Sequence, residues 1–255
     1  MSALLEVRGL SVRYGGVKAV DEFDIDVRPA SITGLIGPNG AGKTSLMDGI
    51  TGFTKATGSI VFDGRDIAER PAHDRARAGM ARTWQSLELF DDLTVGENLA
   101  VAMRPAGRTW GRAARRPEVD VEELLSMLGL DGTTQRVPAE LSQGQRKVLG
   151  LARAMAGGPT LLLADEPAAG LDSSESEILG ARLRTIAESG VGVLLIDHDM
   201  GLVLNVCDHV YVMEFGRALA DGTPAEIRAN RDVIDAYLGG HATAGAASEA
   251  EEVLQ

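Results

Sequence analysis

The stretch from Gly37 to Thr44 has the residue types and the spacing of a phosphate-binding loop. It reads Gly-Pro-Asn-Gly-Ala-Gly-Lys-Thr and matches the pattern Gly-x-x-x-x-Gly-Lys-[Ser/Thr]. Glycines in such a loop let consecutive backbone N–H groups face an anion, and the helix that follows presents its positive end. We therefore expect nucleotide contacts from a continuous run of residues: Gly37, Pro38, Asn39, Gly40, Ala41, Gly42, Lys43, Thr44 and Ser45.

Two side chains of this loop carry the expected chemistry. Lys43 supplies a point charge to the β- and γ-phosphates, and the Thr44 hydroxyl is suited to ligate Mg²⁺. The apolar stretch 31–37 predicts a buried strand before the loop, and residues 45–50 predict a helix after it. The alternative is a glycine-rich turn with a solvated lysine, but the succession of strand, loop and helix favours the phosphate site.

A pair of acidic residues follows a second apolar run. Residues 160–165 predict a strand that brings Asp165 to its carboxyl end, where open α/β sheets keep their ligands. Asp165 can hold Mg²⁺ through water, and Glu166 can orient or deprotonate an attacking water. Two acids after a strand can also simply cap a helix. Paired with the lysine loop, they favour the catalytic interpretation.

Periodicity around these motifs predicts alternating strands and helices. Strands are expected near the N-terminus and around an Asp63-Gly64 turn, at 5–8, 10–12, 24–27 and 59–67. From about 87 to 158 the pattern is helical, with helices expected at 119–130 and 142–156. After this stretch, strands and helices are expected to alternate at 160–165, 173–189, 191–197 and 200–207. A terminal hairpin is expected from strands at 210–214 and 217–221.

This order of elements predicts an α/β fold: a P-loop NTPase core with a mixed sheet, an N-terminal antiparallel β subdomain and an inserted α-helical subdomain. Continuous apolar strands between helices indicate a sheet that is covered on both faces. We expect the core at 1–86 and 159–240 and the helical insertion at 87–158. Residues 241–255 are mostly Ala, Ser, Glu and Gly and predict a disordered tail.

A third motif narrows the family. The run 141–145, Leu-Ser-Gln-Gly-Gln, resembles the LSGGQ signature of ATP-binding cassette (ABC) ATPases and precedes the Asp165 strand, as in that family. The resemblance spans roughly residues 4–240. It implies that Tyr14 stacks on adenine and that Gln85 links Mg²⁺ to the transporter interface. It also implies that Asp172 lies on a loop that crosses to a partner subunit and that His198 is a switch histidine for the γ-phosphate.

The signature also has a physical role, because Ser142, Gln143, Gly144 and Gln145 begin a helix and so form another anion site. In ABC ATPases, ATP on the loop of one subunit meets the signature of the other, so the resemblance implies a head-to-tail dimer of like or related subunits. Hydrolysis then removes the bridging phosphate and reopens the dimer. Gln143 replaces the usual glycine, which we expect to be harmless. Val148 stands where many members carry arginine, and the sequence offers no interpretation of it.

Each of these residues has a plainer explanation when it is taken alone. Tyr14 can be ordinary strand packing, and Gln85 a solvated loop residue. His198 can be a satisfied histidine at a strand end, and Ser142 only a helix cap. The joint order and spacing of the residues favour the family assignment.

Further stretches, at 82–90, 93–98, 197–200 and 222–226, resemble the ATPases of branched-chain amino acid importers. This resemblance implies an ATP-hydrolysing subunit that is peripheral on the cytoplasmic face of the membrane. It works with separate membrane permease subunits, a second ABC ATPase subunit and, indirectly, a solute-binding protein. Leu89 and Phe90 are candidates to receive a permease helix. Amides and urea stay open as solutes.

Composition limits the alternatives. The chain has 255 residues and a net charge of −12, so its charge argues against nonspecific nucleic-acid binding. No apolar run approaches the roughly 18 residues that span a bilayer, we expect no signal peptide, and the single cysteine, Cys207, suits a reducing compartment. A soluble ABC ATPase that regulates or assembles other proteins is the alternative function. A P-loop kinase would lack the signature.

One basic segment stands out in this acidic chain. Residues 104–117 contain five arginines and no acidic residue. The segment can contact anionic lipid head groups or an acidic permease loop, or it can be a solvated loop, which its proline and glycines favour. The sequence leaves these alternatives open.

Overall fold

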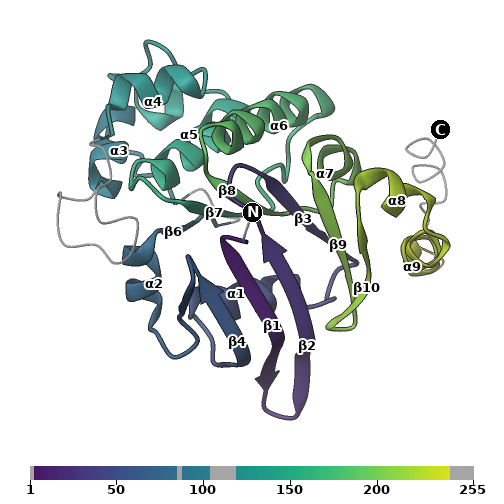
Figure 1. Cartoon of the computed structure of the whole chain (residues 1–255). Coiled ribbons are helices and arrows are strands. Elements are labelled where there is room, and N and C mark those ends of the chain that lie inside the picture. Colours follow the sequence, from purple (N-terminus) through teal and green to yellow (C-terminus); the bar gives the residue numbers. More distant parts are fainter. Residues whose placement is uncertain (1–2, 85–87, 104–118, 242–255) are drawn as a thin grey trace.

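The computed structural model describes residues 3–84, 88–103 and 119–241 (Figure 1). Gln85, the basic segment 104–117 and residues 242–255 of the expected tail lie outside the described residues. Within the described ranges, no helix combines the length and the apolar character that crossing a membrane requires.

The N-terminal strands form a small antiparallel sheet in the order β2-β1-β4-β5. Its strands are β1 (Leu5–Tyr14), β2 (Val17–Val27), β4 (Ala56–Phe62) and β5 (Arg65–Asp66). The two strands expected at 5–8 and 10–12 are one strand with irregular register near Gly9. Asp63 and Gly64 both have left-handed backbone, as a two-residue hairpin turn requires. The antiparallel β subdomain is therefore confirmed.

A second, six-stranded sheet has the order β10-β9-β3-β8-β7-β6. Its strands are β3 (Ile32–Ile36), β6 (Met80–Arg82), β7 (Leu161–Asp165), β8 (Gly192–Ile196), β9 (His209–Glu214) and β10 (Arg217–Gly222). All neighbours are parallel except β9 and β10, so the sheet is mixed, as expected. Because β3, β8 and β7 are parallel neighbours, the segments that follow them emerge at one edge of the sheet.

Both faces of this sheet are covered. Along β7, Leu161 and Leu163 pack on one side with helix α1 (Lys43–Thr51) and the antiparallel sheet. Leu162 and Ala164 pack on the other side with α5 (Gln143–Met155), α6 (Ser173–Glu188) and α7 (Met200–Val206), which lie together over the sheet in Figure 1. This alternation with a period of two explains why every residue of β7 is apolar until Asp165.

The helical stretch contains α3 (Val95–Ala102), α4 (Val121–Met127), a short 3₁₀ turn at Pro138–Glu140 and α5. Leu99, Leu125 and Leu149 are fully buried where these helices pack together. Val148 is 5% exposed and belongs to the same cluster. An apolar residue at that position therefore serves the core, which the sequence did not reveal.

Four elements were not expected from the sequence: α2 (Ala72–Ala78), β6, α8 (Pro224–Ala229) and α9 (Arg231–His241). Helix α2 has no apolar stripe, and β6 has three residues, so neither shows the periodicity on which the expectation relied. Helix α9 ends at His241, where the expected tail begins.

Candidate nucleotide-binding site

The phosphate loop between β3 and α1 is held closely by two neighbouring strands. A side chain at Gly37 would overlap the carbonyl of Met213 on β9, and one at Gly42 would overlap the carbonyl of Ala19 on β2. Both glycines have positive φ, 156° and 109°. The loop therefore needs glycine at these positions for space and for conformation.

Lys43 begins helix α1 beneath this loop. Its side chain is buried, and Nζ donates to the Gly37 carbonyl at 2.6 Å and to the Pro38 carbonyl at 3.0 Å. Burial lowers the pKa of Lys43, while the carboxylates of Glu166 and Asp165 act in the opposite direction. The lysine therefore lies in the field of the acids predicted to share its site, beside the unpaired amides of a helix N-terminus.

Asp165 ends β7 with one carboxylate oxygen engaged and one unengaged. Oδ2 accepts a hydrogen bond from Arg82 at 2.9 Å, whereas the buried Oδ1 has no partner within the described part of the chain. The residue is 2% exposed. A buried carboxylate oxygen without a donor fits a hard cation such as Mg²⁺, which prefers oxygen ligands, and the exposed Thr44 hydroxyl adds another oxygen.

Glu166 and His198 are brought together from β7 and β8. Glu166 is in the left-handed region at φ 46°, and its N–H donates to the Ile196 carbonyl at 2.7 Å. His198 Nδ1 lies 3.9 Å from Glu166 Oε2, and its side chain is 58% exposed. A non-glycine residue in this conformation costs about 1–3 kcal/mol, and such strain clusters at functional sites.

Asp197 is a residue of this site that the sequence analysis did not single out. Its carboxylate is fully buried and accepts from the N–H groups of Ala168, His198 and Asp199 at 3.1, 2.8 and 3.0 Å. Burial raises the pKa of Asp197, and these hydrogen bonds partly oppose the rise. Asp197 thus ties the end of β8 to the segment after Glu166. Its place directly after an apolar strand, like that of Asp165, was the signal that could have found it.

Lys147 of α5 is also close to these acids. Burial lowers the pKa of Lys147, and the carboxylates of Asp197 and Glu166 act in the opposite direction. No role for Lys147 was expected from the sequence. Helix α5 therefore places a basic side chain near the candidate catalytic acids.

The signature residues begin α5 with a reciprocal cap. Ser142 Oγ accepts from the Gln145 N–H at 3.2 Å, and Gln145 Oε1 accepts from the Ser142 N–H at 3.0 Å. The Gly144 N–H donates to a carboxylate oxygen of Glu175 at 3.2 Å, and Gln143 Nε2 donates to the Gly170 carbonyl at 2.8 Å. This helix start therefore already holds an anionic group, and Ser142 and Gln143 are exposed.

The remaining predicted site residues are Asp172, Tyr14 and Gln85. Asp172 caps α6, where Oδ1 accepts from the Glu175 N–H and the Ser174 hydroxyl, both at 2.8 Å, and these bonds lower the pKa of Asp172. Tyr14 ends β1 and is 47% exposed, on the hairpin that touches the phosphate loop through Ala19. The position of Gln85 lies outside the described residues, so its role stays a prediction.

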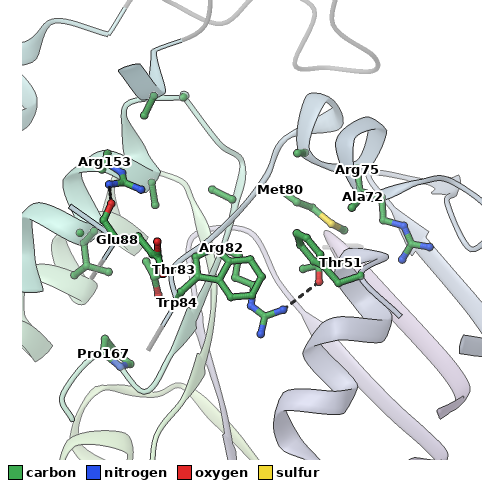
Figure 2. A pocket seen from close by; sticks show the side chains of 18 of the residues that line it. Thr51, Ala72, Arg75, Met80, Arg82, Thr83, Trp84, Glu88, Arg153 and Pro167 are labelled. Atoms are coloured by element: carbon green, nitrogen blue, oxygen red, sulfur yellow. Dashed lines mark hydrogen bonds between the residues drawn. The ribbon is translucent and has the colours of Figure 1, made fainter. Parts of the chain in front are cut away.

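A cleft of about 660 Å³ opens beside the site, between the core and α5 (Figure 2). Arg82 and Trp84 line it from the core side and Arg153 from α5. Next to it, Phe90 is 45% exposed and lies 5.4 Å from the Arg153 guanidinium, while Leu89 packs against the core. Of the two predicted permease contacts, Phe90 is exposed and Leu89 is partly buried.

Comparison with known proteins agrees with this architecture. The family model described as ABC transporter matches residues 20–169, which contain the phosphate loop, the signature, Asp165 and Glu166. The chain belongs to the ABC transporter family. A second model, described as branched-chain amino acid ATP-binding cassette transporter, matches residues 219–243.

Individual members of the family are similar over most of their length. The chain is 42% identical to the high-affinity branched-chain amino acid transport ATP-binding protein BraF of Pseudomonas aeruginosa, covering 92% of this chain and 98% of that protein. It is 39% identical to LivG of Escherichia coli, with the same coverage. A crystal structure of the ADP conformation of an ATP-binding cassette from an ABC transporter superposes with a TM-score of 0.82 at 28% identity, covering 94% of this chain and all of that one.

These findings confirm the ABC ATPase fold, the assignment as an ATPase and the resemblance to branched-chain amino acid transport ATPases. They confirm nucleotide as the ligand of the cassette at the level of the family. The roles of individual site residues, the boundaries of the subdomains and the binding of Mg²⁺ stay predictions.

Proposed function

We propose that this ABC protein is the ATP-hydrolysing subunit of an importer for branched-chain or other hydrophobic amino acids. The observation that carries the proposal is the identity of 42% to a branched-chain amino acid transport ATP-binding protein, over nearly the whole of both chains. The match of residues 219–243 to a branched-chain family model also supports the proposal, in a region that lies outside the match to the general ABC transporter model.

ATP binds first through the phosphate loop. The loop amides and the positive end of α1 hold the phosphates, and Lys43 gives up its two carbonyl partners to contact the β- and γ-phosphates. Tyr14, half exposed at the end of β1, stacks on adenine. Thr44, Gln85 and Asp165 would hold Mg²⁺, which when bound neutralises charge on the phosphate oxygens.

Hydrolysis uses the acids and the histidine at the sheet edge. Glu166 orients the attacking water and accepts its proton, because its carboxylate is partly exposed beside the loop. His198 contacts the γ-phosphate, and Asp197 fixes the histidine by accepting its backbone N–H. Asp197 also accepts the Ala168 N–H, so it fixes the positions of Glu166 and His198 relative to each other.

A second ABC subunit, identical or closely related, completes the site. The helix start at Ser142, Gln143, Gly144 and Gln145, of which the first two are exposed, meets the γ-phosphate bound to the opposite subunit. Asp172 lies on the loop that reaches across. ATP binding closes this head-to-tail dimer, and loss of the γ-phosphate reopens it. The expected division into a core of 1–86 and 159–240 and a helical insertion of 87–158 lets the signature move relative to the phosphate loop.

Membrane permease subunits receive this motion. We place their contact at the cleft beside Trp84 and Phe90, which exposes aromatic side chains between the core and α5. The chain then works as a peripheral protein on the cytoplasmic face of the membrane. A solute-binding protein delivers the solute, and no nucleic acid takes part.

Reconstitution tests this function. The chain is placed in proteoliposomes with its permease subunits, its partner ATPase and the binding protein, and uptake of labelled leucine is measured with and without ATP inside. We expect ATP-dependent uptake, together with ATP hydrolysis that the loaded binding protein stimulates. Glu166→Gln serves as the matched inactive control. Hydrolysis that stays the same with and without permease, together with no uptake, would support the soluble, non-transport alternative.

A further inference from the structure

Arg82 is a buried arginine that joins two carboxylates of the site. Its side chain is 5% exposed at the end of β6. Nη1 donates to Asp48 Oδ1 at 2.5 Å, and Nη2 donates to Asp165 Oδ2 at 2.9 Å. Asp165 is buried and Asp48 is partly exposed, and a planar guanidinium that spans both acids holds them in a defined orientation.

The contact at Asp165 leaves one defined oxygen for a metal ion. Because Oδ2 is engaged by Arg82, the unpartnered Oδ1 is the acceptor that remains. The neighbouring residue adds to the restraint, since Thr83 Oγ1 accepts the Asp165 N–H at 3.2 Å. Residues 82 and 83 thus hold both the backbone and the carboxylate of Asp165.

The contact at Asp48 reaches the helix that follows the phosphate loop. Asp48 lies on α1, one helical turn beyond Thr44. Arg82 therefore clamps the helix that carries Lys43 and Thr44 to the strand that carries Asp165. Two of the three predicted protein ligands of Mg²⁺, Thr44 and Asp165, come from these two elements.

The other face of Arg82 is covered by aromatic side chains of the cleft. Its guanidinium carbon lies 4.3 Å from the centre of the Trp84 ring and 6.0 Å from that of Phe53. The two rings contact each other edge to face at 5.0 Å, and they are 43% and 59% exposed. Figure 2 shows Arg82, Trp84 and Thr51 together at the cleft. A molecule seated in the cleft thus contacts the rings that cover Arg82.

We infer that Arg82 is a positioning residue, which orients Asp165 for Mg²⁺ and connects that carboxylate to the aromatic wall of the cleft. The inference rests on the proposed nucleotide site. Because linkage is reciprocal, metal-bound nucleotide then changes the surroundings of Trp84, and an occupant of the cleft changes the affinity for metal-bound nucleotide.

Nucleotide affinity in the absence and presence of Mg²⁺ tests the first half of the inference. ATP binding to Arg82→Lys and Arg82→Met is measured by calorimetry in EDTA and then in Mg²⁺. We expect EDTA affinities within about twofold of the wild type, because Lys43 and the loop amides are unchanged. The gain in affinity on adding Mg²⁺ is expected to shrink by about tenfold, as for other residues that orient a metal ligand.

Two comparisons separate positioning from general stability. Arg82→Lys keeps the buried charge but cannot span both acids, so it carries the test if the methionine variant fails to fold. Arg184→Lys alters another arginine–aspartate pair, with Asp208 at 3.0 Å, and should keep the full Mg²⁺ gain. A wild-type Mg²⁺ gain in Arg82→Lys would overturn the inference, even if its melting temperature fell.

Fluorescence tests the second half. The chain has two tryptophans, so Trp110→Phe leaves Trp84 as the sole reporter. We expect Mg²⁺ to change the Trp84 emission of the ATP-bound protein, and Arg82→Lys to abolish that change. An unresponsive Trp84 in a protein that shows the Mg²⁺ gain overturns the link to the cleft. A wild type that binds no ATP would instead overturn the proposed nucleotide site, and this inference with it.

Discussion

Two helix starts in this molecule are suited to anions, and they are built in different ways. The start of α1 lies under a loop that needs Gly37 and Gly42, because β9 and β2 press against it. The start of α5 is an exposed turn closed by the reciprocal cap of Ser142 and Gln145. At α1 the chain's own acids surround the site, whereas at α5 the Gly144 N–H faces a carboxylate of Glu175.

The two sites differ in the chemical groups that each contributes. The α1 site gathers a lysine, a metal-ligand candidate and a base candidate within one subunit, and these are the groups proposed to bind and cleave the nucleotide. The α5 site offers a helix end at the surface and no catalytic group of its own. In the proposed dimer, a nucleotide that contacts both sites lies between two subunits. Substitutions at α1 and at α5 can test the two sites separately.

The largest effect is expected for Lys43→Ala. Charge-assisted hydrogen bonds to two phosphates are lost, each about 1.5–3 kcal/mol, so ATP affinity should fall by at least about 100-fold. Calorimetry with ATP measures the loss, and circular dichroism confirms that the variant folds. Retained affinity would contradict the assignment of the α1 loop as the phosphate site.

Glu166→Gln should separate binding from chemistry. The amide cannot accept the proton of water, so hydrolysis should fall by about 10²–10⁴-fold while ATP still binds. The uncleaved nucleotide should hold two subunits together, which light scattering detects as an ATP-dependent dimer. A wild-type rate of hydrolysis would show that Glu166 is not the base.

Ser142→Ala probes the α5 side. Loss of the cap should lower the free energy of unfolding by about 1 kcal/mol, measured in urea. ATP affinity of the single subunit should be unchanged, but ATP-dependent dimerisation in the Glu166→Gln background should be lost. Thr94→Ala is the matched control, because Thr94 closes the same kind of capping box on α3. It should cost similar stability and leave dimerisation intact.

The smallest effect is expected for Gln143→Gly, which restores the residue usual in the signature. It removes one exposed hydrogen bond to Gly170 and adds backbone freedom, so stability should fall by about 0.5–1 kcal/mol in urea unfolding. ATP hydrolysis should stay within about twofold of the wild type, with Gln143→Ala as the comparison. A large loss of activity would show that the Gln143–Gly170 contact takes part in catalysis.

Local patterns were enough to place every strand of the six-stranded sheet except β6, and the motifs at the strand ends. Lys43, Asp165 and His198 each follow an apolar strand, and the carboxyl ends of neighbouring parallel strands meet at one edge. The cap at Ser142 was also predictable, because a cap and its partner lie three residues apart. Elements without periodicity, such as α2 and β6, were missed because the prediction relied on such local patterns.

Contacts between distant segments could not be read in this way. Asp197 acquires its importance by burial against Ala168, and Arg82 by spanning Asp48 and Asp165, which lie 34 and 83 positions away along the chain. Val148 is explained only by the core it enters. Sequence alone specifies which groups can do the chemistry, since short spacings carry that information. Packing decides which of them meet and what holds them there, because burial and pairing depend on residues far apart in the chain.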